Sequence, residues 1–377
     1  MVNLSFKATC ASGENWQSVA DQCLKNLGAE PTSANFGFLY ITDPLAPYLN
    51  NLLEALRTQT GVKDWIGTVG AGICYTGLEV YDEPAAAIML TTLPEDSYRL
   101  LPAGMEAMST MLTENRNWIA EQAVHFGIVH GDPRNTHIAQ IIQSLSTDLD
   151  PGFLVGGLTS ASDGSFPQQI AGQFYENGLS GVLLSSRIPV ITGLTQGCTP
   201  LAARHTITRS EGNILAELDG RPALDVFKED IGVALAEDLS RVAGYIFVGL
   251  PVPGSDTGDY LVRNLMGIDP NEKLLAIGDN LEDDAPIMFC RRDADTAHED
   301  MIRMLTDLRK RAKGRQIKGG VYYTCLGRGR HQFGEHSEEL KLIQEQLGDF
   351  PLVGFFANGE ISHNRLYGYT GVLTLFL

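Results

Sequence analysis

Apolar residues recur along this chain at two periods, and the two periods alternate. Spacings of three and four place apolar side chains on one helix face, and they predict helices over 16–27, 45–56, 138–149 and 296–312. The last of these has Thr296 and Glu299 in the spacing of a capping box, and Gly314 follows its end. Short apolar runs predict strands over 36–41, 86–91, 126–129, 181–185, 244–249, 274–277, 321–325 and 371–377.

The order strand, helix, strand, strand occurs three times. The units begin near Gly37, Phe126 and Gly320, and the second strand of each is rich in glycine and starts about thirty residues after the first. A strand–helix–strand passage implies a parallel pair, whereas the strand that follows directly can pair antiparallel through a hairpin. We therefore predict an α/β fold: two related α/β domains built from repeated strand–helix–strand–strand units, with mixed sheets flanked by helices.

The boundary between the two domains is predicted near Gly220–Arg221, which gives domains over 30–220 and 221–377.

The presence of glycines in the second strands calls for an explanation, because glycine weakens a strand. They indicate either close sheet-on-sheet packing or a bulge, or else a close approach of the backbone to a ligand, and the sequence leaves these explanations open.

Composition narrows the classes of partner. The chain has 377 residues and a net charge of 28 − 46 = −18, which argues against binding to nucleic acid or to anionic membranes. No apolar run approaches the ~20 residues of a membrane-spanning helix. The segment Met1–Cys10 lacks the apolar stretch of an export signal, so we expect a cytoplasmic protein. Its six cysteines are widely spaced, and we expect all of them to be free thiols.

Common catalytic and nucleotide-binding motifs are absent from the sequence. There is no G-x-G-x-x-G, P-loop or G-x-S-x-G, and His331 and His336 do not have the spacing of a zinc motif. The basic run 309–318 lies at a helix C-terminus, where cations complement the helix dipole. We therefore predict no catalytic residues, no metal site and a protein that is not an enzyme.

Three polar clusters interrupt apolar or glycine-rich stretches: TQGCTP from Thr195, CLGRG from Cys325 and FFANGEI from Phe355. With PLVGFFANGEI and the later LYGYTGVLTLF, these clusters resemble the FIST family, a sensory module with FIST N and FIST C parts. The stretch GNILAELDGRPALDVF from Gly212 is also similar. The segment from Trp65 is a looser match, since Thr68 and Val69 stand where the family tends to carry Cys followed by Ser or Thr.

The resemblance implies a stand-alone protein that binds a small ligand for intracellular signal transduction, with amino acids as the ligands proposed for the family and a signalling protein as a partner. Some bacterial members are described as haem-binding nitric oxide sensors, which is one alternative. That alternative needs an axial ligand, for which His125, His130 and His137 are the candidates. Otherwise no cofactor is expected. The other alternative is an enzyme that uses Cys325 as a thiol nucleophile, with His331 or His363 as its base.

We place the ligand site in the C-terminal part, with two residues contributed by the preceding part. The four C-terminal residues are Cys325, Arg328, Asn358 and Glu360, and the other two are Gln196 and Cys198. Cys325 and Arg328 follow the first strand of the third unit, and Asn358 and Glu360 follow the second. If those strands are parallel neighbours, both pairs emerge at one carboxyl edge, where α/β proteins bind ligands. Arg328 suits a carboxylate and Glu360 an amino group, although the two side chains could instead pair with each other.

Overall fold

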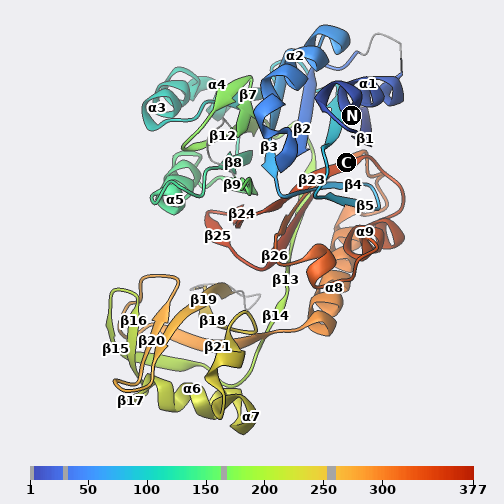
Figure 1. Ribbon diagram of the computed structural model, residues 1–377. Coiled ribbons are helices and arrows are strands. Elements are labelled where there is room, and N and C mark those ends of the chain that lie inside the picture. Colours follow the sequence, from blue (N-terminus) through green and yellow to red (C-terminus); the bar gives the residue numbers. More distant parts are fainter. Residues whose placement is uncertain (1–3, 29–32, 163–167, 253–259) are drawn as a thin grey trace. The chain divides into compact units, whose positions relative to one another are not determined.

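The computed structural model describes residues 4–28, 33–162, 168–252 and 260–377 (Figure 1). The chain divides into a larger compact unit, Met1–Thr195 with Asp300–Leu377, and a smaller unit, Gln196–Glu299. The boundary predicted near Gly220–Arg221 lies inside the smaller unit. The division into domains over 30–220 and 221–377, made from the sequence, stays a prediction.

The larger unit contains three sheets of six strands each. The first sheet has the order β1 (Phe6–Ser12), β6 (Ala85–Thr91), β2 (Phe36–Thr42), β3 (Asp64–Gly70), β10 (Gln169–Ala171) and β11 (Gln173–Tyr175). The second has the order β7 (Tyr98–Leu101), β12 (Leu179–Leu184), β8 (Phe126–Gly131), β9 (Phe153–Leu158), β24 (Glu360–His363) and β25 (Arg365–Tyr367). The third has the order β13 (Val190–Gln196), β26 (Thr370–Phe376), β22 (Gly319–Cys325), β23 (Leu352–Ala357), β4 (Gly72–Tyr75) and β5 (Leu78–Tyr81).

The three sheets repeat one pattern, which confirms the α/β fold with mixed sheets. Each contains a parallel pair, β2–β3, β8–β9 or β22–β23. The strand that closes each unit, β6, β12 or β26, pairs antiparallel with the first strand of that pair. The strand–helix–strand–strand repeat predicted from the sequence is therefore present three times.

Each unit also contributes a hairpin to the sheet of another unit. The hairpin β4–β5 follows β3 in the chain but pairs with β23, β10–β11 follows β9 but pairs with β3, and β24–β25 follows β23 but pairs with β9. This exchange links the three sheets in a cycle. The sequence pattern did not predict it, because local periodicity does not say which distant strand a hairpin joins.

Helices cover the outer faces of these sheets (Figure 1). Those of the larger unit are α1 (Trp16–Leu27), η1 (Asp43–Tyr48), α2 (Leu49–Thr60), α3 (Met105–Glu114), α4 (Arg116–Glu121), α5 (Ile138–Asp148), η3 (Gly329–His331) and α9 (Glu338–Leu347). Helix α8 (Ala294–Ala312) begins in the smaller unit and ends in the larger one. The capping box predicted at Thr296 is wrong: α8 begins two residues earlier, and the Asp293 carboxylate accepts from the backbone N–H groups of Asp295 and Thr296.

The glycines of the second strands permit close contact between paired strands. A Cβ atom on Gly67, Gly156 or Gly354 would lie 1.7 Å from the carbonyl oxygen of the neighbouring strand. The three positions are equivalent in the repeat. The close contact at these glycines is between paired strands of one sheet, and not between sheets as the sequence analysis considered.

The inner faces of the three sheets share one core. It joins Phe38 and Ile66 of the first sheet, Ile128 and Val155 of the second, and Val321 and other residues of the third.

The six cysteines are all free thiols, as predicted. None of the helices that the structure describes is long and apolar enough to cross a membrane.

The smaller unit is a sheet that closes on itself in the order β18, β19, β20, β16, β15 and β21, since β21 also pairs with β18. Its elements are β14 (Cys198–Pro200), β15 (His205–Glu211), β16 (Ile214–Leu218), β17 (Arg221–Pro222), α6 (Ala223–Ile231), α7 (Val233–Ala236), η2 (Leu239–Val242), β18 (Ile246–Pro251), β19 (Tyr260–Asp269), β20 (Leu274–Ile277) and β21 (Pro286–Arg292). A separate apolar core fills it, in which Phe227 of α6 stacks edge-on against Phe289.

Candidate functional site

The carboxyl end of β22 presents polar side chains on both faces of the third sheet. Tyr322 and Thr324 point toward α9, where their hydroxyl groups donate to Glu339 Oε1 over 2.6 and 3.2 Å. Because side chains alternate along a strand, Tyr323 and Cys325 point to the opposite face, where Tyr323 is part of the shared core. The sequence predicted one site at this edge, and the structure divides its polar groups between two faces.

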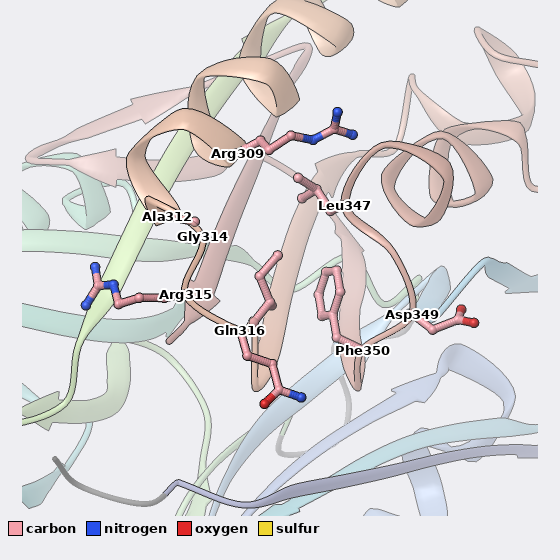
Figure 2. A pocket seen from close by; sticks show the side chains of 9 residues that line it. Arg309, Ala312, Gly314, Arg315, Gln316, Leu347, Asp349 and Phe350 are labelled. Atoms are coloured by element: carbon pink, nitrogen blue, oxygen red, sulfur yellow. The ribbon is translucent and has the colours of Figure 1, made fainter.

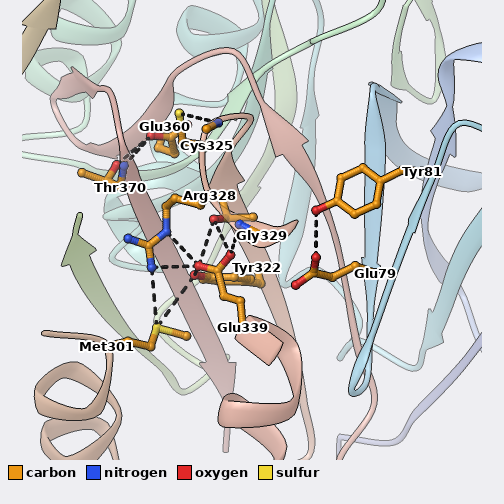
Figure 3. Close-up of polar contacts among 12 residues, drawn as sticks. Glu79, Tyr81, Met301, Tyr322, Cys325, Arg328, Gly329, Glu339, Glu360 and Thr370 are labelled. Carbon is orange, nitrogen blue, oxygen red and sulfur yellow. Dashed lines mark hydrogen bonds and ion pairs between the residues drawn. The ribbon is translucent and has the colours of Figure 1, made fainter. Parts of the chain in front are cut away.

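Arg328 is fully buried and forms an ion pair with Glu339 (Figure 3). Its Nε donates to Glu339 Oε1 over 2.8 Å, and the Gly329 backbone N–H donates to Oε2 over 2.9 Å. The guanidinium carbon also lies 4.9 Å from the ring centre of Phe333. The pairing of Arg328 with Glu360, considered from the sequence, is therefore replaced by a pairing with Glu339. Nη1 of Arg328 is buried and has no hydrogen-bond partner among the described residues.

Glu360 is also fully buried, and its contacts lie on β26. The backbone N–H and the hydroxyl of Thr370 both donate to Glu360 Oε2, over 3.1 and 2.8 Å, while Oε1 is buried without a partner in the described part of the chain. Burial raises the pKa of Glu360 to about 8, because the Thr370 hydrogen bonds and the charge of Arg328 offset only part of the desolvation. At neutral pH this carboxyl group is mostly protonated, so it can donate a hydrogen bond.

Cys325 is half-buried at the start of the turn formed by residues 325–329. Its sulfur accepts from the Gly327 backbone N–H over 3.5 Å. Burial and the nearby Glu360 raise the pKa of the Cys325 thiol to about 12. The thiol is therefore protonated at neutral pH, which argues against the alternative of a thiolate nucleophile.

The other three predicted site residues have different surroundings. Asn358 is exposed in the turn between β23 and β24, and its backbone N–H donates to the Leu158 carbonyl. Gln196 and Cys198 belong to the smaller unit, where the Gln196 side chain donates to the Tyr260 carbonyl over 2.7 Å. The structure thus brings Cys325, Arg328 and Glu360 to one end of β22 and β23. A single site of all six residues stays a prediction.

Two carboxylates of this region were not predicted from the sequence. Glu339 accepts hydrogen bonds from four residues. The sequence feature that could have identified it is its position four residues before Ile343, on the buried stripe of α9. Its neighbour Glu338, in contrast, is exposed. Glu79 arrives on β5 and accepts from the Tyr81 hydroxyl over 2.8 Å (Figure 3). Burial and the charge of Glu339 raise the pKa of Glu79 to about 7. No sequence pattern places Glu79 here, because it arrives on an exchanged hairpin.

A second buried polar group lies where the first strands of the three units meet. The Tyr40 hydroxyl lies 2.8 Å from that of Tyr323 and 3.2 Å from His130 Nε2, and the Phe355 ring packs against all three. Burial lowers the pKa of His130 to about 3. These three residues occupy the same position in the three units, one in each sheet.

The three histidines considered as haem ligands lie in different surroundings, and the haem alternative stays a prediction. His130 is fully buried among aromatic rings, and its Nε2 is already bound by Tyr40. His125 Nδ1 bonds to the Leu149 carbonyl over 3.0 Å, and His137 is exposed beside α5. Within the described ranges, no three His, Cys, Asp or Glu side chains are grouped so as to hold a metal ion.

Comparison with known proteins places the chain in a family. The FIST N domain matches residues 35–221 and the FIST C domain matches residues 223–363. An uncharacterised protein of Mycobacterium tuberculosis (strain ATCC 25618 / H37Rv) is 30% identical over 339 residues, covering 87% of each chain. An uncharacterised protein of Mycobacterium bovis (strain ATCC BAA-935 / AF2122/97) is 28% identical over 353 residues, covering 89% of this chain and 88% of the relative. This chain therefore belongs to the FIST family, whose domains are generally described as sensory domains for small ligands in signal transduction.

Proposed function

We propose that this chain is a cytoplasmic sensor of a small metabolite, and that the ligand binds at the 325–329 turn. The observation that carries the proposal is a pair of fully buried polar atoms without partners in the described residues, Arg328 Nη1 and Glu360 Oε1. Both side chains follow the parallel strands β22 and β23 at their carboxyl ends, where α/β sheets bind ligands. An unsatisfied buried polar atom costs about 1–3 kcal/mol, so a ligand that supplied its partner would gain affinity.

The backbone beside the turn supports the same location. Tyr369 has a φ of 61°, a left-handed conformation that is rare for a bulky residue. Its ring packs against Gly327, where a Cβ atom would lie 3.2 Å from Tyr369 Cε1. Strained residues of this kind concentrate at binding sites. Tyr369 also immediately precedes Thr370, which holds Glu360.

The chemistry favours a ligand with a carboxylate, such as an amino acid. A guanidinium N–H and a protonated carboxyl group are both hydrogen-bond donors, and a carboxylate offers two acceptor oxygens. This assigns Glu360 a role opposite to the one expected from the sequence, since a protonated Glu360 binds an acceptor and not an amino group. A signalling protein would then recognise the ligand-bound state of this chain, and its identity is left to experiment.

A thermal-shift screen of amino acids and central metabolites at millimolar concentration tests the proposal. A ligand at a hundredfold excess over its Kd stabilises the native state by about 2.7 kcal/mol, and the melting temperature should rise by a few degrees. Arg328→Lys keeps the charge that faces Glu339 but removes Nη1, and it should abolish most of that shift. Arg330→Lys is the matched control, because Arg330 is only half-buried and pairs with Asp82.

The pH dependence supplies the second arm. The ligand-induced shift should decline above about pH 8 in the wild type, as Glu360 ionises, and should stay constant in Glu360→Gln. The proposal fails if none of the compounds moves the melting temperature, or if Arg328→Lys keeps the full shift. A Soret absorbance band on titration with haem would instead favour the haem-based nitric oxide sensor.

A further inference from the structure

A groove of about 300 Å³ lies between the C-terminal ends of α8 and α9, within the larger unit (Figure 2). Helix α8 ends at Ala312, and the chain then turns through Lys313 and Gly314, whose φ angles are 52° and 73°. Two consecutive left-handed residues direct the chain away from the helix axis. The connection to β22 then runs along one side of the groove, and the end of α9 forms the other.

The floor of the groove is apolar, and its rim carries two arginines and one aspartate, Asp349. Ala312 and Phe350 are buried and Leu347 is half-buried, whereas Arg309 and Arg315 at the rim are exposed. Figure 2 shows the two arginines on different sides of Phe350, with their guanidinium groups extending outward. An apolar floor with a charged rim suits a molecule that has an apolar body and a charged end.

Neither rim arginine has a carboxylate partner among the described residues. The only described polar contact of the Arg309 side chain is the amide oxygen of Gln346, at 3.5 Å. Arg311, on the same helix, differs: it pairs with Asp307 over 3.1 Å and donates to the Thr192 carbonyl. The charges of Arg309 and Arg315 thus remain available to an anion.

The surrounding charge is positive in a chain that is strongly acidic overall. Residues 309–318 carry six cationic side chains and no acidic one, against a net charge of −18 for the whole chain. The C-terminal ends of α8 and α9 together contribute about one negative charge through their dipoles. The lining adds one more, Asp349, whose carboxylate accepts from Gln344. Apart from Arg311, which pairs with Asp307, the five remaining cationic side chains of the run outnumber these negative charges.

We propose that this groove is a second binding site, separate from the 325–329 turn, and that it takes a small organic anion with a short apolar body. The apolar part packs on Leu347 and Phe350, and the anionic end is bound by one of the two rim arginines, Arg309 on one side of Phe350 or Arg315 on the other. The planar forks of these arginines can bind carboxylate or phosphate oxygens in pairs. The proposal does not depend on the function proposed above, because the two sites share no residue.

Ligand-observed NMR titrations with three probes test it. Hexanoate has both the charge and the apolar body, acetate has only the charge, and 1-hexanol has only the body. Hexanoate should bind saturably, and each of the other two should bind about tenfold more weakly or worse, because each lacks one of the two contributions. If acetate or 1-hexanol binds as tightly as hexanoate, or if hexanoate shows no saturable binding, the proposal is wrong.

A pair of matched double variants separates a site from general electrostatics. R309Q/R315Q should weaken hexanoate binding about tenfold, since it removes both charge-assisted partners. K310Q/K313Q removes the same charge from the same segment but not from the lining, and it should change the Kd less than about twofold, because exposed charges are screened. Equal losses in the two variants would overturn the proposal. Thermal melts of both establish that they are folded, and binding at the 325–329 turn should be unchanged in each.

Discussion

One ion pair of the larger unit and one of the smaller unit differ in their exposure to solvent. In the larger unit, Arg328 and Glu339 have no exposed side-chain surface. In the smaller unit, the His205 ring lies between Asp219 and Asp230, at 2.6 and 2.9 Å, and all three side chains retain contact with solvent. A charge taken out of water depends on its partner, whereas a solvated charge can exchange its partner for water. The contrast teaches that similar contact distances should carry very different free energies at a buried pair and at a solvated one.

The largest expected effect follows from breaking the buried pair. Glu339→Ala leaves the Arg328 guanidinium buried without a countercharge, so the free energy of unfolding should fall by about 3–5 kcal/mol, measured by urea denaturation. The double variant R328M/E339L removes both charges and should recover much of that loss, since apolar side chains of similar size can replace a buried pair. A loss below about 1 kcal/mol in Glu339→Ala would contradict the assignment.

Two glycine-to-alanine variants, one in each unit, compare a crowded backbone position with an open one. Gly354→Ala in the larger unit places a Cβ atom 1.7 Å from the Tyr322 carbonyl oxygen and should cost about 3 kcal/mol or more. Gly212→Ala in the smaller unit meets no atom within 4 Å, and only its φ of 59° opposes the side chain, so about 1 kcal/mol is expected. Equal destabilisation of the two variants in urea denaturation would show that close strand contact does not explain the repeated glycine.

The smallest effect is expected at His205. Burial lowers the pKa of this imidazole, but the hydrogen bonds and charges of Asp219 and Asp230 more than offset it, and the net pKa is raised above the usual value. A raised pKa stabilises the native state below the unfolded pKa of about 6.5, and that contribution is lost as pH rises through the higher native pKa.

Urea denaturation at pH 5.5 and pH 8.5 checks this sign. His205→Ala should destabilise the protein more at the lower pH, by about 1 kcal/mol or less, because solvent screens the pair. A larger loss at pH 8.5 than at pH 5.5 would contradict the raised pKa.

The sequence was sufficient for features that depend on local spacing. The repeated order of strands and helices predicted the mixed α/β sheets, because the 2.0 and 3.6 periods report directly which face is buried. The polar residues that follow β22 and β23 were also identified, since Cys325 and Glu360 interrupt apolar runs.

Features that depend on distant contacts were not predicted. Neither the exchange of hairpins nor the arrival of Glu79 near Glu339 leaves a local signature. The partner of Arg328 was missed because a glutamate in the first turn of a helix is normally a solvated residue that complements the dipole. Glu339 occupies that place but faces inward, and only the tertiary packing of α9 on β22 reveals it.

Hydrogen–deuterium exchange, measured with and without the compound that gives the largest thermal shift, tests the central claim most directly. Ligand binding at the 325–329 turn should slow amide exchange in residues 325–329 and 360–370, because these segments hold Arg328, Glu360 and Thr370. Residues 196–252 of the smaller unit should exchange at unchanged rates. Protection confined to the smaller unit, with none at 325–329, would contradict the account.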